Sequence, residues 1–316
     1  MVALAGRSAL PNAKRIVVKV GSALLVDEDK NTLNKAWLAG IAGDISRLKA
    51  AGKDVVVVSS GAIALGSRLL KIHNKTLSLQ EKQAAAATGQ VTLAHAWMEA
   101  LGAYKVQAAQ ILLSPDDTET RRKHLNARAT MGALLDLGAV PVVNENDTVA
   151  TAEIRFGDND RLAARVAAMI GADLLILLSD VDGLYTGNPN QNNDAAHLPQ
   201  IDHINDDIMA MAGAANAHYA SGGMVTKLEA GRISTAAGCH MIICDGRDPE
   251  PLLRLENGAR CSCFIATKTP HAARKQWIAG ALKPRGIIGV DAGAAVALRS
   301  GKSLLPAGVV AVDGLF

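Results

Sequence analysis

A stretch near the middle of the chain, NENDTVATAEIRFGDND (residues 144–160), gathers residues that could bind a polar ligand. It holds five carboxylates and three asparagines beside few apolar side chains. Carboxylate and amide oxygens can accept hydrogen bonds from a substrate ammonium group, hold lysine side chains in place and ligate Mg²⁺. This combination of residue types favours a binding site over an ordinary surface loop.

The end of this stretch predicts the start of a helix, with Asp158 or Asn159 as its cap and Asp160 in its first turn. Capping and the helix dipole would account for these two aspartates without any ligand. They would not account for Asn144 and Asp147, which directly follow an apolar run. Polar groups in that position bind one another or a polar ligand, and we favour the ligand.

Two glycine-containing turns could supply the positive part of such a site. KVGSALL places Lys19 near the end of an apolar run and Gly21–Ser22 just after it, where backbone N–H groups can meet phosphate oxygens. SGGMVTKLEAG places Gly222–Gly223 before a helical pattern with Lys227 in its first or second turn, and a helix N-terminus attracts anions. Taken alone, each pattern is also explained by an ordinary turn beside a solvated lysine.

Two common nucleotide-binding motifs are absent from the sequence. GKS at residues 301–303 lacks the glycine that GxxxxGK[ST] requires, and no GxGxxG occurs. The sequence therefore indicates neither a Walker-type nucleotidase nor a Rossmann dehydrogenase.

The elements that must position these residues follow from short apolar runs rich in β-branched residues, which are typical of strands covered on both faces. The runs are residues 15–20, 54–60, 108–114, 139–144, 173–180 and 240–245. Helical patterns lie between them; one includes Leu33 and Leu48, with Asn31 or Thr32 as its cap and Gly52 at its end. This alternation predicts an α/β fold with a mainly parallel, doubly wound sheet.

In such sheets ligands bind beyond the carboxyl ends of the strands. Four of the predicted strands end in glycine or polar residues, namely Gly21–Ser22, Ser59–Gly61, Asn144–Asp147 and Ser179–Asp180. We therefore expect these four segments to form one functional edge of the sheet.

Composition excludes several classes of protein. The 316 residues are 49% hydrophobic and 3% aromatic, so we expect a core of aliphatic residues and alanine. The formal charge of +3 is too small for a nucleic-acid binder that depends on a dense basic face. The four cysteines form no CxxC pair, which favours free thiols over disulfides or zinc. No signal peptide or run of about 20 apolar residues occurs, and we expect a cytoplasmic protein that does not contact a membrane.

Together the motifs KVGSALL, VVVVSSGAIALG, PVVNENDTVATAEIRFGDNDRLAA, LLILLSDVDGLYTGNP and SGGMVTKLEAG resemble the glutamate 5-kinases of the amino acid kinase family, over roughly residues 14–270. NEND and GDND are the most specific of these motifs. The resemblance implies a three-layer α/β/α sandwich with a mainly parallel central sheet over residues 1–280. Residues 285–316 resemble the beginning of a β-rich PUA domain, and we expect that domain to be incomplete because the chain stops early. Ser221 stands where the family usually has threonine.

The resemblance implies that ATP, with Mg²⁺, phosphorylates the side-chain carboxylate of L-glutamate in the first step of proline biosynthesis. Lys19, Lys227 and Asp160 would be catalytic. The residues that would bind glutamate are Ser60, Gly61, Asn144, Asp147, Asp158 and Asn159. Those that would bind the nucleotide are Lys19, Gly21, Ser22, Ser179, Asp180, Ser221, Gly222, Gly223, Met224, Val225, Thr226 and Lys227. No metal ligand is assigned. The family also implies feedback inhibition by proline, a homo-oligomer (dimer or tetramer) and functional coupling to glutamyl phosphate reductase.

The chemistry of that reaction agrees with the residues present. A glutamate side chain has a pKa near 4.3, so it is ionised at neutral pH and needs no general base. The obstacle is repulsion between this anion and the phosphates, which two lysines, Mg²⁺ and backbone N–H donors can offset. The alternatives are another kinase of the family, acting on acetylglutamate, aspartate, carbamate or a nucleoside monophosphate, a sensor without turnover, and an RNA-binding protein.

Overall fold

The computed structural model describes residues 9–27, 32–72, 76–149, 159–189, 191, 194–214, 223–273, 286–300 and 302–314. It divides into two compact units, Met1–Ala273 and Arg274–Phe316. The candidate site residues that it describes all lie in the first unit.

The first unit is built on an eight-stranded sheet in the order β10-β12-β11-β7-β1-β4-β6-β5. These strands are β1 (Arg15–Val20), β4 (Asp54–Ser59), β5 (Ala108–Leu113), β6 (Val140–Glu145), β7 (Leu174–Ser179), β10 (Gln200–Ile201), β11 (His240–Asp245) and β12 (Cys261–Phe264). All neighbouring strands are parallel except β11 and β12, which are antiparallel. Two small sheets pair β2 (Val26–Asp27) with β3 (Thr32–Leu33) and β8 (Leu184–Tyr185) with β9 (His197–Leu198).

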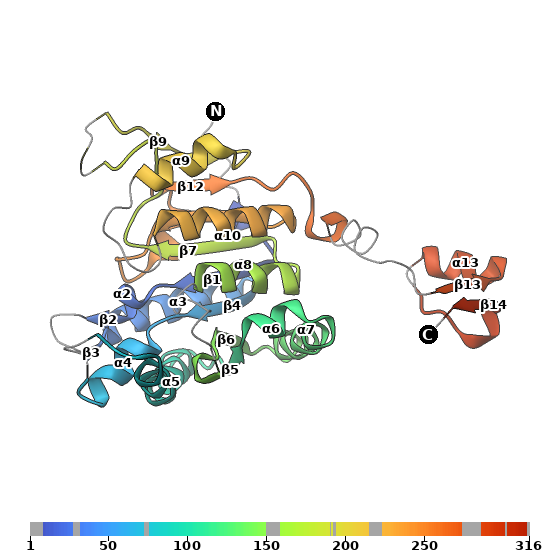
Figure 1. The fold of residues 1–316 in the computed structure, drawn as a ribbon, viewed down its shortest axis with the longest axis horizontal. Coiled ribbons are helices and arrows are strands. Elements are labelled where there is room, and N and C mark those ends of the chain that lie inside the picture. Colours follow the sequence, from blue (N-terminus) through green and yellow to red (C-terminus); the bar gives the residue numbers. More distant parts are fainter. Residues whose placement is uncertain are drawn as a thin grey trace. The chain divides into compact units, whose positions relative to one another are not determined.

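Helices cover both faces of the sheet, which gives the three layers expected from the sequence (Figure 1). On one face lie α2 (Ser22–Leu25), α3 (Lys35–Ala50), α4 (Ala62–Leu69), α5 (Leu79–Gly102) and α11 (Pro251–Glu256). On the other lie α7 (Arg121–Asp136), α8 (Asn159–Ile170), α9 (Asp206–Ala214) and α10 (Met224–Ala236). The short helices α6 (Pro115–Glu119) and η1 (Asp147–Val149) follow β5 and β6.

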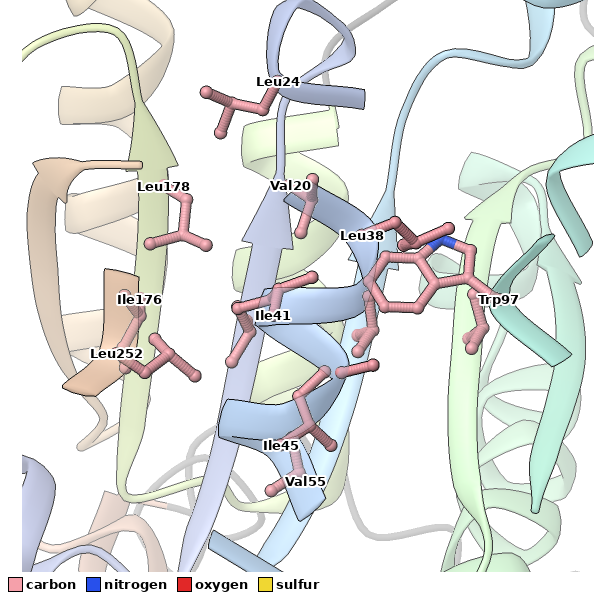
Figure 2. Close-up of a cluster of buried hydrophobic side chains, with 14 of the residues drawn as sticks. Val20, Leu24, Leu38, Ile41, Ile45, Val55, Trp97, Ile176, Leu178 and Leu252 are labelled. Carbon is pink, nitrogen blue, oxygen red and sulfur yellow. The ribbon is translucent and has the colours of Figure 1, made fainter. Parts of the chain in front are cut away.

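Two apolar layers hold the sheet between these helices, and Figure 2 shows part of the first. There Ile41 of α3, Trp97 of α5 and Leu252 of α11 pack with strand residues such as Ile176. Fully burying one side chain of this size contributes about 1.5–3 kcal/mol. Because side chains alternate along a strand, Ile16, Val18 and Val20 enter this layer, whereas Val17 enters the second layer beneath α8.

The sequence predicted the central strands to within one residue of their ends, but one prediction of burial was wrong. Residues 108–114 were expected to be covered on both faces, yet in β5 only Leu113 is buried. This strand is the last in the sheet and, among the described strands, pairs only with β6. The antiparallel strand β12 and the long helix α5 were not predicted.

The cap of α3 was also placed wrongly. Asn34, not Asn31 or Thr32, caps this helix, because its side chain accepts a hydrogen bond from Trp37 N at 3.2 Å. Leu33 lies in β3, before the helix. The predicted end is confirmed, since Gly52 has φ of +77°, which favours glycine.

The second unit contains β13 (Gly286–Val290), α13 (Ala292–Arg299), η2 (Pro306–Gly308) and β14 (Val309–Gly314). The two strands pair antiparallel, and Asp291 caps α13 by accepting from Ala294 N at 2.7 Å. Of the helices that the structure describes, none is both long and apolar enough to cross a membrane.

Candidate active site

Three charged side chains from distant parts of the chain meet at the carboxyl edge of the sheet. Lys19 Nζ lies 2.6 Å from Asp160 Oδ1, and Lys227 Nζ lies 3.4 Å from Asp160 Oδ2. All three residues are buried, with exposures of 8% for Lys19, 1% for Asp160 and 6% for Lys227. One carboxylate thus serves two ammonium groups, which leaves this charged trio with one net positive charge.

The electrostatics of the charged trio keep Asp160 ionised. Burial alone raises the pKa of a carboxyl group, but the charges of Lys19 and Lys227 and the hydrogen bonds from Lys19 and Thr226 outweigh it. The pKa of Asp160 is therefore below its usual value. Since a buried charge is tolerated only when it is paired, each member of the trio depends on the others.

The local fold explains why these residues meet. Lys19 is the fifth residue of β1 and, by the alternation of a strand, lies on the face covered by α8 and α10. Asp160 and Lys227 both lie in the first turns of their helices. Helices α8 and α10 begin where the parallel strands end, so their N-termini point their backbone N–H groups to the same region.

A second cluster lies beside the charged trio and consists of amide and hydroxyl groups. Asn159 Nδ2 donates to Ser60 Oγ at 2.8 Å and to Asn144 Oδ1 at 3.3 Å. Asn144 Nδ2 in turn donates to Gln90 Oε1 at 2.7 Å. Asn159 Oδ1 is buried and has no hydrogen-bond partner in the part of the chain that the structure describes. Because Asn159 and Asp160 are adjacent, the two clusters form one site.

A cavity of about 260 Å³ adjoins this amide cluster. It lies between α5, β5 and the turn after β6, and its lining includes Gln90, Gln110, Glu145 and Asp147. Asp147 is 8% exposed, and burial raises its pKa to about 6. In the described residues no cation offsets that burial, so this carboxylate is suited to a ligand that brings a positive charge.

The described residues among those predicted to bind nucleotide lie at the same edge of the sheet. Ser179 ends β7, which pairs with β1 from Leu174 to Leu178, and its hydroxyl donates to Asp180 Oδ1 at 3.0 Å. Gly21 and Ser22 follow β1, and Gly223 precedes α10. Gly61, predicted to bind substrate, precedes α4 with φ of +103°. Met224 and Val225 are half-buried in the first turn of α10.

The hydroxyl of Thr226, which was predicted to bind nucleotide, donates to Asp160 Oδ2 at 3.0 Å, and its role in nucleotide binding stays a prediction. Gln90 was not predicted at all, because a single glutamine within an alanine-rich helix gives no signal. Asp158, Ser221 and Gly222 lie outside the described residues. No group of three or more potential metal ligands occurs among the described residues.

Comparison with known proteins is consistent with this geometry. The model of the amino acid kinase family matches residues 14–245. The chain is 58% identical over 313 residues to a glutamate 5-kinase of Rhizobium etli (strain CIAT 652), which covers 99% of this chain and 80% of that protein. It is 56% identical over 307 residues to a glutamate 5-kinase of Bradyrhizobium sp. (strain BTAi1), covering 97% of this chain and 81% of that protein.

Solved structures share the fold at low sequence identity. The UMP kinase of Bacillus anthracis superposes with a TM-score of 0.55 at 16% identity, covering 81% of this chain and 98% of that one. Carbamate kinase from Giardia lamblia, solved with AMP-PNP, gives a TM-score of 0.55 at 16% identity, with coverages of 80% and 99%. These likenesses show the fold alone.

Proposed function

This chain belongs to the amino acid kinase family, and we propose that it transfers the γ-phosphoryl group of ATP to the side-chain carboxylate of L-glutamate, giving L-glutamyl 5-phosphate. The observation that carries the proposal is the meeting of Lys19 and Lys227 at Asp160 in a chain that is 58% identical to a glutamate 5-kinase.

The charged trio fits the electrostatic needs of that reaction. A glutamate carboxylate is already ionised at neutral pH, so attack on phosphorus needs no base. The transition state spreads negative charge over the oxygens of the transferred group, and fixed positive charges stabilise it. Lys19 and Lys227 supply those charges, while Asp160 holds both nitrogens in place before the substrates bind.

The amide cluster and the cavity fit an amino acid. Asn159 Oδ1 and the Asp147 carboxylate are acceptors for an ammonium group, and both are buried. Ser60, Gly61 and Asn144 would complete this substrate side, and the relationship to the glutamate 5-kinases adds Asp158, which lies outside the described residues. The opposite part of the edge, with Gly21–Ser22, Ser179–Asp180 and residues 223–227, would hold the nucleotide, and the same relationship adds Ser221 and Gly222.

A Mg²⁺ ion would arrive with the nucleotide. Such an ion binds mainly to phosphate oxygens and water and needs only one or two carboxylates from the protein. Asp180, which is exposed beside Ser179, would be its protein ligand. When bound, the ion neutralises phosphate charge.

The relationship to the glutamate 5-kinases supports several wider proposals. We propose that the protein acts in the cytoplasm as a homo-oligomer, that proline inhibits it, and that its labile product passes to glutamyl phosphate reductase. We also propose that residues 1–280 form the kinase domain and that residues 285–316 form the beginning of a PUA-like domain.

The test is the trapping of an acyl phosphate with hydroxylamine, with wild-type protein, Mg-ATP and a panel that includes glutamate, aspartate and acetylglutamate. We expect a hydroxamate from glutamate alone. A hydroxamate from another acid would reassign the substrate, and none from any acid, with ATP still bound, would favour a sensor.

The Lys227→Ala variant tests the residue roles. We expect kcat to fall by at least about 10²–10³-fold because the variant loses a positive charge that stabilises the transition state. The fold should survive because Lys19 still pairs with Asp160. Lys35→Ala, at an exposed lysine that begins α3, is the control and should keep full activity. A near wild-type rate for Lys227→Ala would remove this residue from the mechanism.

A further inference from the structure

We propose that Gln90 is a positioning residue, which together with the backbone N–H of Glu145 holds the Asn144 amide in one orientation and thereby makes Asn159 Oδ1 an acceptor for the ammonium group of the substrate. Gln90 lies on α5, a helix that supplies none of the residues predicted from the sequence. This inference rests on the proposed function, because it assigns a role within the same amino-acid site.

The orientation of Asn144 follows from a group whose polarity is fixed. The backbone N–H of Glu145 can only donate, and it lies 2.9 Å from the side chain of Asn144, so the atom that it faces is Oδ1. The Nδ2 group of Asn144 must then lie on the other side, 2.7 Å from Gln90. Since an NH₂ group only donates, the Gln90 atom that meets it is the acceptor Oε1.

The orientation of Asn159 follows from that of Asn144. Asn144 Oδ1 can only accept, so the Asn159 group that lies 3.3 Å from it is Nδ2. This NH₂ group also donates to Ser60 Oγ at 2.8 Å. Both of its hydrogens are therefore used within the amide cluster, and the remaining atom, Oδ1, is an acceptor.

Asn159 Oδ1, the acceptor at the end of the hydrogen bonds that link Gln90, Asn144 and Asn159, is the feature that indicates a ligand. Asn159 is 6% exposed, and its Oδ1 has no partner within the described parts of the chain. Leaving a buried acceptor without a donor is unfavourable, because the desolvation of that atom is not offset. An ammonium group of an amino acid would supply the missing donor, whereas a carboxylate, which only accepts, would not.

Helix α5 is held in place by a close crossing with α4. A Cβ atom at Gly89 would come within 1.9 Å of Ala62 O, and one at Gly66 within 1.7 Å of Ala85 O, so the two backbones touch at the turn that carries Gln90. Two helical turns later, Trp97 Nε1 donates to Ser59 Oγ at 2.9 Å. The helix thus contacts the ends of both β4 and β6, which fixes Gln90 relative to Asn144.

The decisive variant is Gln90→Met, which keeps the size of the side chain and removes the acceptor. We expect the glutamate KM to rise about 10-fold, with the KM of ATP and kcat within about 3-fold of wild type. Gln90→Glu, which retains an acceptor oxygen, should restore most of the affinity. Gln80→Met, at an exposed glutamine in the first turn of the same helix, is the matched control and should change nothing.

A second measurement separates positioning from general damage to the site. Glutarate is glutamate without its ammonium group, so its inhibition constant should be nearly the same for wild type and Gln90→Met. Equal losses for glutamate and glutarate, or an unchanged glutamate KM, would overturn the role of Gln90. An inactive wild type that forms no hydroxamate with glutamate would instead overturn the proposed function and this inference with it.

Discussion

Two buried aspartates at the site have opposite environments. Asp160 lies between two lysines, which hold its pKa below the usual value, whereas burial without an offsetting cation raises the pKa of Asp147 to about 6. A raised carboxyl pKa means that the folded state binds the proton more tightly than the unfolded state. Stability therefore increases as pH falls from about 6 to the unfolded value near 3.8 and is reduced at neutral pH.

Removing the charge of Asp147 should stabilise the protein and impair its binding of glutamate. For Asp147→Asn we expect the free energy of unfolding at pH 7.5 to rise by about 1–3 kcal/mol, with the gain disappearing near pH 4. The glutamate KM should rise because an ammonium partner is lost. Urea unfolding from pH 4 to 7.5 and steady-state kinetics measure both effects.

The exposed residue Asp136, at the end of α7, provides the control. Asp136→Asn should change stability by less than about 0.5 kcal/mol and leave the glutamate KM unchanged. A stability of Asp147→Asn that equals wild type at every pH would contradict the effect of burial, and an unchanged glutamate KM would remove Asp147 from the substrate site.

For single residues, the sequence predicted the location of those site residues that lie at the end of a strand or the start of a helix. Lys19, Asp160 and Lys227 could be expected at one edge because the carboxyl ends of parallel strands and the N-termini of the following helices lie there. Gln90 could not be predicted, since its place depends on how two helices cross. The contact of the Thr226 hydroxyl with Asp160 could not be predicted either, since it depends on how α10 packs against α8.

Among the contacts between helices, the close approach of α4 and α5 tolerates substitution least, because their backbones touch. Glycine at positions 66 and 89 lets the backbones touch, because any side chain there would overlap a carbonyl group of the facing helix. Further along α5, Trp97 is fully buried in the first apolar layer and donates to Ser59 at the end of β4. The substrate side of the site therefore depends on a helix pair that is distant from the charged trio in sequence.

Gly89→Ala and Gly66→Ala should each separate these helices. We expect a loss of about 1–3 kcal/mol in the free energy of unfolding and a higher glutamate KM, because Gln90 moves with α5. Gly132→Ala is the matched control: it lies inside α7, and a Cβ there meets no atom within 4 Å. That change should stabilise by about 0.5–1 kcal/mol. Thermal unfolding and glutamate kinetics on the three variants measure these effects. Equal stability and equal glutamate KM for all three variants would contradict the role of the close helix crossing.

The predicted elements were those with a local signal. Central parallel strands are continuous apolar runs because both faces are covered, and residues 15–20 and 240–245 match β1 and β11. The edge strand β5 has a similarly apolar sequence, so its residues alone could not distinguish it from a central strand. Helix α5 is alanine-rich with little contrast between its faces, and β12 is only Cys261–Phe264.

At the scale of the whole molecule, the two units differ in how well they cover apolar residues. The first has an apolar layer on each face of its sheet. In the second, several large apolar side chains are more than half exposed, namely Ile287, Val296, Leu305, Val310 and Val312. A segment of this length seldom builds a sufficient core unaided. We therefore expect the first unit to determine both stability and catalysis.

A chain that ends at Ala273 should keep the activity of the full chain. We expect kcat and the glutamate KM to stay within about 2-fold, since the described site residues all lie in the first unit, and we expect less binding of an apolar dye such as ANS. Loss of activity in a shortened chain with unchanged circular dichroism would instead assign the second unit a part in catalysis.

The position of β1 bears on how the protein is made. β1 lies at the centre of the sheet, where Ile16 pairs with Val55 on one side and with Leu174 on the other. At ordinary rates of translation the second partner is synthesised roughly 10–30 s after the first strand. During that interval the side of β1 that pairs with β7 has no neighbouring strand and exposes unpaired backbone groups, so the nascent chain is most prone to aggregate before β7 emerges. Chaperones that bind nascent chains should act on this protein in that window.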